Sequence, residues 1–375
     1  MAEWKECLLG DLITFQRGHD LPKSKMSGNG YPVVGSNGII GFHNEYTTEY
    51  PSITVGRSGN VGKPYIVYGR SWSHNTSLYI KEFKGTDPVF IYYFLQTLDL
   101  GNYAGGSAVP TLNRNHIHSL NVRVPADVST QEKIANTLKA LDDKIDKNTD
   151  INKNLEQQAQ AIFNNAIQQS KSVTYVKLGS LADVKGGKRL PKGANLMSIP
   201  NSHPYIRVRD LNDVVFASLS ANYEYVDDET QKAISRYITT TDDVLISIVG
   251  TVGLTAIVDK SLNMANLTEN CVKVTKLHGI SPEYLLLYLR SQHGSEEIKK
   301  GTVGAVQAKL PIKNIQALSV PLLPQSDLQL LNDTLKILFH QLSINIAESK
   351  CLTDIRDSLL PRLMSGELDV SEFDL

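Results

Sequence analysis

The sequence contains few cysteines and no long apolar run, and these absences exclude several classes of protein. Cys7, Cys271 and Cys351 lie far apart and form no Cys-x-x-Cys pair, so neither a disulfide framework nor a zinc site is expected. No apolar stretch approaches the roughly 20 residues of a membrane-spanning helix. The N-terminus also lacks the basic and apolar segments of a secretory signal. We therefore expect a cytoplasmic protein with no membrane partner.

The chain as a whole also lacks an excess of charge of either sign. Its 38 Lys and Arg residues and 39 Asp and Glu residues give a net charge of −1, which argues against a generic basic nucleic-acid binder. The charge is divided unevenly, however. Residues 171–325 carry eighteen basic and fourteen acidic residues, whereas residues 366–375 carry four acidic residues and no basic one. A DNA-facing patch can therefore coexist with a neutral total.

The chain contains two copies of one unit, because blocks of the first half recur in order in the second half. The paired blocks are Leu9–Leu12 with Leu178–Leu181, Gly18–Lys23 with Gly187–Lys192, Gly59–Gly62 with Gly250–Gly253, Asp87–Leu95 with Ser281–Leu289, and Thr137–Lys139 with Thr334–Lys336. Chance does not supply so many matches in order. Each copy comprises short β-branched and aromatic runs between turn residues, which predict a mixed α+β domain, and then a long helix.

Both long helices are predicted from apolar residues at heptad spacing. In the first helix the a positions are Ile134, Leu141, Asn148, Leu155 and Ile162, and the d positions are Leu138, Ile145, Asn152, Ala159 and Ala166. The second helix repeats this pattern 197 residues later, so Asn345 is equivalent to Asn148. A buried Asn at an a position needs a partner in the facing helix and sets the register of a coiled coil. The alternative is a partly exposed Asn in a frayed centre.

Several segments resemble one protein family. Gln131–Ile145 (QEKIANTLKALDDKI), Leu155–Phe163 (LEQQAQAIF) and Leu352–Leu368 (LTDIRDSLLPRLMSGEL) resemble the helices of Type I restriction–modification specificity subunits. Trp4–Leu12 (WKECLLGDL) and Tyr175–Leu181 (YVKLGSL) resemble the starts of that family's target-recognition domains. The second helix departs from the pattern at its start, Leu323–Leu335, which lacks the Gln-Glu-Lys-Ile of the first.

With the internal repeat, the resemblance implies an α+β fold of two β-rich target-recognition domains separated by two long antiparallel coiled-coil helices. The expected parts are a first recognition domain at 1–130, a first helix at 131–170, a second recognition domain at 171–325, a second helix at 326–365 and an acidic tail at 366–375. An internal two-fold would place the domains at opposite ends of the helix pair, which suits two short DNA sites separated by a fixed gap.

The resemblance also implies the partners of the chain. They are double-stranded DNA, two methyltransferase subunits that pack on the helices, and restriction subunits that act as nuclease and translocase. Methylation is expected at adenine, with S-adenosylmethionine bound by the methyltransferase partner and no cofactor in this chain.

The sequence offers no set of catalytic residues. It contains neither the Pro-Pro dipeptide of an adenine methyltransferase motif nor the Gly-x4-Gly-Lys-Ser/Thr of a P-loop. The glycines of Gly35–Gly41 lack the strand–turn–helix context of a phosphate loop, so tight turns explain them better. His116 and His118 have no nearby carboxylate or cysteine, which favours surface or DNA contact over a metal site. A non-catalytic chain is therefore predicted.

Candidates for DNA contact are basic, amide and hydroxyl side chains in loops, since these bind phosphates and base edges. In the first half they are Arg17, His19, Lys23, Arg57, Ser58, Asn60, Lys63, Arg70, His74, Asn75, Ser107 and Arg114. In the second half they are Lys185, Lys188, Arg189, Lys192, Arg207 and Arg209, with the last two expected on one face of a strand. Any one of them could equally be solvated surface.

A coiled-coil adaptor that binds other proteins through duplicated domains remains the alternative. The two halves agree in their turns and helices but differ in their loops, which favours two domains that read different base sequences.

Overall fold

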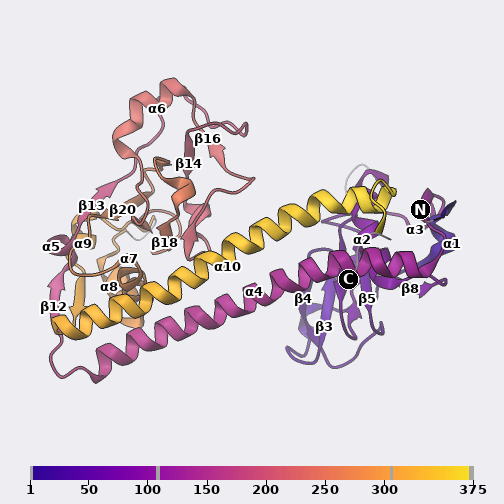
Figure 1. Ribbon diagram of the computed structural model, residues 1–375, viewed down its shortest axis with the longest axis horizontal. Helices are drawn as coiled ribbons and strands as arrows, with labels where there is room; N and C mark the ends of the chain where they lie inside the picture. The colour runs from indigo at the N-terminus through magenta and orange to yellow at the C-terminus, as the bar shows by residue number, and fades with distance from the viewer. Residues whose placement is uncertain (1–2, 107–109, 305–306, 371–375) are drawn as a thin grey trace. The chain divides into compact units, whose positions relative to one another are not determined.

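The computed structural model describes residues 3–106, 110–304 and 307–370 (Figure 1). It divides into two compact units. The first comprises residues 1–148 and 348–375, and the second comprises residues 149–347. Each unit therefore contains one globular domain and a part of each long helix.

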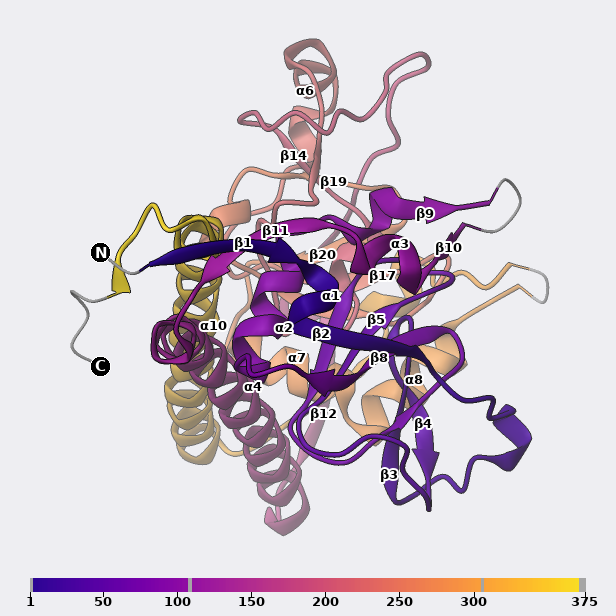
Figure 2. The same ribbon diagram turned by 90° about the vertical axis from the view of Figure 1, so that its right-hand side faces the viewer.

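The globular part of the first unit is built from small sheets (Figure 2). The four-stranded sheet has the order β2 (Ile13–Arg17), β8 (Ser77–Phe83), β5 (Ser52–Gly56), β6 (Pro64–Val67). A three-stranded sheet has the order β4 (Gly38–His43), β3 (Tyr31–Gly35), β7 (Trp72–Ser73). Two antiparallel pairs are β1 (Trp4–Leu8) with β11 (Asn121–Pro125), and β9 (Ala104–Gly105) with β10 (Thr111–Leu112). The helical segments are α1 (Leu9–Leu12), η1 (Lys23–Lys25), α2 (Pro88–Gln96), η2 (Leu100–Tyr103) and α3 (Arg114–His118).

The globular part of the second unit repeats this plan with an enlarged sheet. Its five-stranded sheet has the order β13 (Asp183–Gly186), β20 (Cys271–Thr275), β17 (Val244–Ser247), β18 (Thr255–Val258), β15 (Phe216–Ala217). The three-stranded sheet is β16 (Glu224–Tyr225), β14 (Pro204–Ile206), β19 (Asn266–Leu267), and β12 (Thr174–Lys177) pairs with β21 (Ser319–Leu322). The helical segments are α5 (Leu178–Leu181), η3 (Val208–Leu211), α6 (Asp228–Ile234), η4 (Ser235–Tyr237), η5 (Lys260–Leu262), α7 (Pro282–Arg290), α8 (Gln292–Gly301) and α9 (Ile312–Gln316).

The repeated sequence blocks form equivalent elements in the two units. The Leu-Gly-x-Leu blocks form α1 and α5, each between two strands. The Asp/Ser-Pro blocks begin α2 and α7: the Asp87 carboxylate accepts the Phe90 N–H (2.7 Å), and the Ser281 hydroxyl accepts the Tyr284 N–H (3.2 Å). The apolar sides of these helices are buried in the core of each domain. The predicted fold class, a duplicated α+β chain with two long helices, is confirmed.

The long helices are α4 (Val128–Gln169) and α10 (Gln325–Ser365), and they pack against each other in both units (Figure 1). In the first unit, Asn148 donates to Glu348 over 2.8 Å and Arg356 donates to Asp142 over 2.6 Å. In the second unit, Asn345 donates to Asn152 over 2.9 Å. Residue numbers rise along one helix as they fall along the other in the first unit, so the helices are antiparallel there.

Asn148 and Asn345 are 1% and 5% exposed, and each amide finds a partner in the facing helix. Asn148 also donates to Ser349 (3.2 Å). The Asn148–Ser349 and Asn345–Asn152 contacts therefore each join an a position to a d position. Ile162 was predicted at an a position between the helices, but it is 36% exposed. Phe163 is buried in its place, with its ring against Tyr284 of α7. A helix of 3.6 residues per turn drifts from a seven-residue repeat, and here the apolar side follows the domain core.

Candidate nucleic-acid interface

Four segments of the first domain meet at one end of its four-stranded sheet. They are residues 17–20 from the end of β2, 57–63 after β5, 74–76 before β8, and 111–114 from β10 to the start of α3. We call them the first loop cluster. Backbone hydrogen bonds join them. The His19 N–H donates to the Ser73 carbonyl oxygen (2.7 Å), the Arg57 N–H to the Thr76 carbonyl oxygen (2.8 Å), and the Leu112 N–H to the Arg57 carbonyl oxygen (2.9 Å).

The close approach of the first and third segments depends on a glycine. A Cβ atom at Gly18 would collide with the carbonyl oxygen of His74. The missing side chain lets His19 pair with His74 in a parallel bridge, and lets the Asn75 amide donate to the Asp20 carboxylate. Most candidates of the first half therefore lie together: Arg17, His19, Arg57, Ser58, Asn60, Lys63, His74, Asn75 and Arg114.

Three candidates of the first half lie elsewhere. Arg70 pairs with Glu49 (2.8 Å) and lies over the ring of Tyr46, which contacts Tyr31 at the start of β3. Lys23 begins the exposed turn η1, beyond the cluster. Ser107 lies outside the described residues.

The second domain repeats the backbone frame. Its segments are residues 187–190, 248–254, 268–270 and 307–310, which we call the second loop cluster. The Lys188 N–H donates to Leu267 (2.8 Å), the Ile248 N–H to Asn270 (2.8 Å), and the Leu310 N–H to Ile248 (2.9 Å), each to the carbonyl oxygen. These bonds match those of the first cluster one by one. They make the following positions equivalent: Gly18 and Gly187, Asp20 and Arg189, Arg57 and Ile248, Asn75 and Glu269, Thr76 and Asn270, Thr111 and Lys309.

Basic candidates of the second half differ in how firmly they are held. Arg189 donates to Glu269 over 2.8 Å, and Lys188 lies over the ring of Tyr237. Lys185 is on β13 and pairs with Asp183 at 3.5 Å. Lys192 is exposed in the loop that follows the first segment.

Arg207 and Arg209 do not share a strand face, so that prediction is wrong. Arg207 follows β14, and Arg209 lies in the 3₁₀ turn η3. Both form ion pairs with Glu224, and Arg209 also lies 3.5 Å from Asp210. Burial raises the pKa of Asp210 to about 6, although Arg209 opposes this shift. The acidic neighbours offset the charge that a phosphate contact would need.

His118 was expected at the surface or on DNA, and the structure gives it another role. Its ring stacks on Phe15 and its Nε2 accepts the Phe15 N–H over 2.9 Å. An accepting Nε2 requires the neutral ring. Burial, with Lys84 and Arg114, lowers the pKa of His118 accordingly. This histidine therefore stabilises the first domain.

Sequence reasoning missed Thr76, Glu269, Asn270 and Lys309, which belong to the clusters. Thr76 Oγ1 shares a hydrogen bond of 2.9 Å with the His74 ring. Glu269 holds Arg189, and Lys309 is exposed beside Val249. The self-comparison could have found Glu269 and Asn270 by carrying the block from His74 to Thr76 across to the second half.

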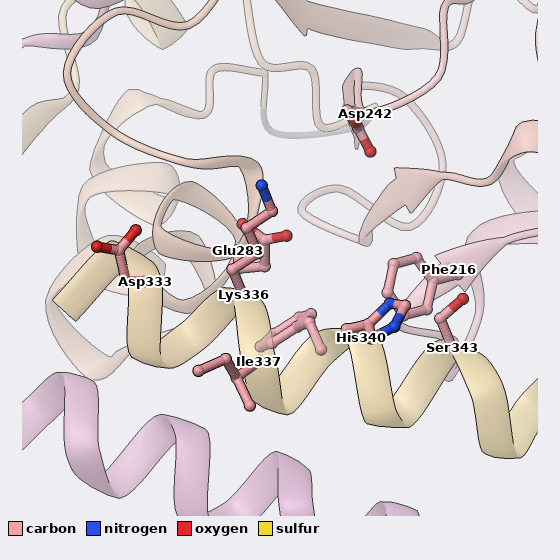
Figure 3. A pocket seen from close by; sticks show the side chains of 9 residues that line it. Phe216, Asp242, Glu283, Asp333, Lys336, Ile337, His340 and Ser343 are labelled. Atoms are coloured by element: carbon pink, nitrogen blue, oxygen red, sulfur yellow. The ribbon is translucent and has the colours of Figure 1, made fainter. Parts of the chain in front are cut away.

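A hollow of about 620 Å³ in the second unit lies apart from these loops (Figure 3). Its lining includes Lys336, Ile337 and His340 of α10, together with Phe216 and Asp242. None of the predicted DNA-contacting residues lines it. Among the described residues there is neither a group of His, Cys, Asp and Glu that could hold a metal ion nor a helix able to cross a membrane.

The comparisons with known proteins agree with this duplicated architecture. The family model for the Type I restriction modification DNA specificity domain matches residues 1–157 and again 170–349. The specificity subunit of the Type I restriction enzyme HindI from Haemophilus influenzae is 22% identical over 362 residues, with 75% of this chain and 77% of the relative covered. The MjaIX specificity subunit from Methanocaldococcus jannaschii is 23% identical over 315 residues, covering 76% and 69%.

The chain belongs to the family of Type I restriction–modification DNA specificity domains. Its fold is similar to the crystal structure of a Type I restriction–modification S subunit from M. genitalium, with a TM-score of 0.64, 17% identity and 96% of both chains covered. The predicted role as a non-catalytic DNA specificity subunit is confirmed by this membership, and the adaptor alternative is not favoured.

Proposed function

We propose that this chain reads a bipartite double-stranded DNA target, with one half-site for each loop cluster. A repeated backbone frame that carries different side chains is the observation behind this proposal. In the turn after β5, the first cluster has Arg57, Ser58, Asn60 and Lys63. The equivalent turn of the second cluster has Ile248, Val249, Thr251 and Leu254. Equal frames with unequal side chains suit two readers of different base sequences.

The long helices are proposed to hold two methyltransferase subunits. Leu330 and Ile337 are each 70% exposed and Ile344 is 47% exposed, at heptad spacing along α10. The residues buried against α4 and the domain core, such as Leu331, Leu335 and Leu342, lie on another side of the helix. Large apolar residues exposed along one face mark a surface for a protein partner.

The remaining partners follow from the role in a restriction–modification complex. S-adenosylmethionine is bound by the methyltransferase subunits, and restriction subunits join them for cleavage in the cytoplasm. In this chain we propose a first recognition domain at 1–130, a second at 171–325 and connecting helices at 131–170 and 326–365, with Asn148 and Asn345 setting the register. The acidic tail begins at Gly366.

Reconstitution tests the proposed function. The chain alone, mixed with S-adenosylmethionine and DNA, is expected to give no methylation, and addition of the methyltransferase partner is expected to give methylation at one bipartite sequence. Methyl transfer by the chain alone, or methylation by the partner at the same sites without this chain, would contradict the proposal.

A further inference from the structure

The two loop clusters contain an equivalent pair of polar residues whose hydrogen-bonding character is reversed between the copies. In the second cluster the pair is Arg189 with Glu269, and in the first it is Asp20 with Asn75. Both pairs form where a glycine allows two segments to touch: Gly187 against the Thr268 carbonyl oxygen, and Gly18 against that of His74.

Arg189 is held so that its outer end is free. Within the described residues, its one hydrogen bond runs from Nε to Glu269 Oε1 (2.8 Å), and the Arg189 side chain is 82% exposed. Among the described residues, no hydrogen bond is made by Arg189 Nη1 or Nη2. These two nitrogens form the fork that pairs with two acceptors of one base edge.

The carboxylate that holds Arg189 is itself fixed at both oxygens. Glu269 Oε2 accepts a hydrogen bond of 3.2 Å from the hydroxyl of Thr268, which is buried. Although burial opposes the shift, the hydrogen bonds from Arg189 and Thr268 lower the pKa of Glu269, so it stays charged at neutral pH. An exposed ion pair adds little to stability, so restriction of the arginine rotamer is its main effect.

The equivalent pair of the first cluster presents acceptors instead. The Asn75 amide nitrogen donates to Asp20 Oδ1, and Arg17 Nη2 lies 3.9 Å from the same oxygen. Asp20 Oδ2 and Asn75 Oδ1 accept none of the hydrogen bonds made within the described residues. The outward side of this pair can therefore accept from an exocyclic amino group, which cytosine and adenine carry on their major-groove edges.

We propose that these two pairs are specificity determinants for the bound DNA, an inference that rests on the proposed function. Arg189, positioned by Glu269, donates to the O6 and N7 acceptors of a guanine in the second half-site. Asp20, positioned by Asn75, accepts from the amino group of a cytosine or adenine in the first half-site. The same place in the frame thus selects opposite base-edge chemistry in the two half-sites.

The test uses the complex with its methyltransferase partner and measures methylation rates on targets randomised in both half-sites. Arg189→Ala is expected to lower the preference for guanine at one position of the second half-site by roughly 5- to 150-fold, with the first half-site unchanged. Glu269→Ala should weaken the same preference, and Glu269→Gln, whose amide oxygen can still accept from Nε, should restore part of it. Lys260→Ala removes an exposed cation of η5 and serves as the matched control with unchanged base preferences.

A transplant provides the second arm. Arg189→Asp with Glu269→Asn installs the first pair in the second frame, and the preferred base should change from guanine to cytosine or adenine. Randomised targets show which of the two amino bases is chosen. Unchanged base preferences in Arg189→Ala, with full methylation, would overturn this inference while leaving the proposed function intact. A wild-type complex whose methylation shows no sequence preference would instead contradict the proposed function.

Discussion

Arg356 of α10 donates a hydrogen bond of 2.6 Å to Asp142 of α4, whose other carboxylate oxygen accepts the Tyr93 hydroxyl over 2.6 Å. One carboxylate thus joins the second long helix, the first long helix and helix α2 of the first domain. Arg356 occupies the d position equivalent to Ala159, 197 residues earlier. It is partly buried there and pairs with both Asp142 and Asp357, which explains a charged residue in the apolar pattern.

Removal of this carboxylate should destabilise the first unit. Asp142→Ala removes the acceptor of the Tyr93 hydroxyl and of Arg356 Nη1, which costs about 1–3 kcal/mol, while Arg356 keeps its pair with Asp357. The free energy of unfolding from denaturant titration measures the effect. Asp143→Ala is the matched control, since its partly exposed pair with Lys139, four residues away on the same helix, is worth about 0–1 kcal/mol. Equal effects of the two variants would disprove a special role for Asp142.

Acid should destabilise the first domain through His118. Its folded-state pKa is lowered, so the unfolded chain binds a proton more readily. The stabilisation is therefore fully present above the unfolded pKa of about 6.5 and is lost as pH falls through the lower folded value. Denaturation midpoints from pH 8 to pH 5 should fall less steeply for His118→Gln than for the wild type. Parallel pH profiles would show that the Phe15–His118 hydrogen bond does not carry this effect.

The Asn345–Asn152 contact should lower the stability of the helix pair while fixing the alignment of the two helices. Replacing both residues with leucine fills the layer with apolar side chains and should raise the free energy of unfolding. The same change removes the penalty on other helix alignments, so methylation by the reconstituted complex should fall. Asn345→Leu alone leaves the Asn152 amide without this partner and provides the comparison. Higher stability with unchanged methylation would show that the asparagine layer does not set the register.

The exposed apolar residues of α10 should be needed for assembly. Leu330→Asp with Ile337→Asp places charges in the proposed partner surface, so the methyltransferase subunit should no longer copurify, while thermal unfolding stays close to that of the wild type. Lys260→Asp, at an exposed position of η5 outside the long helices, is the control and should leave copurification intact. Normal assembly of the double variant would place the partner elsewhere.

Much of the fold could be predicted from the sequence because the repeat blocks fall on fixed structural points. The Leu-Gly-x-Leu turns, the capped helices α2 and α7, and the heptads each have a local chemical cause. The drift that exposes Ile162 was not predictable from a strict heptad, because the domain core decides which side of the helix is buried. The partners of Arg207 and His118 also come from distant segments, Glu224 and Phe15, which no local pattern indicates.

Charge reversal in one cluster tests the central claim most directly. The triple variant Arg17→Glu, Arg57→Glu, Lys63→Glu changes the first loop cluster alone, and the pair Lys188→Glu, Arg189→Glu changes the second. The measurement is methylation by the reconstituted complex on targets randomised in both half-sites. In the triple variant, the preference at the first half-site should be altered or lost and that at the second half-site kept. In the double variant, the preference at the second half-site should be altered or lost and that at the first kept. If the triple variant methylated both half-sites of the wild-type target with unchanged preference, the assignment of one half-site to each loop cluster would be contradicted.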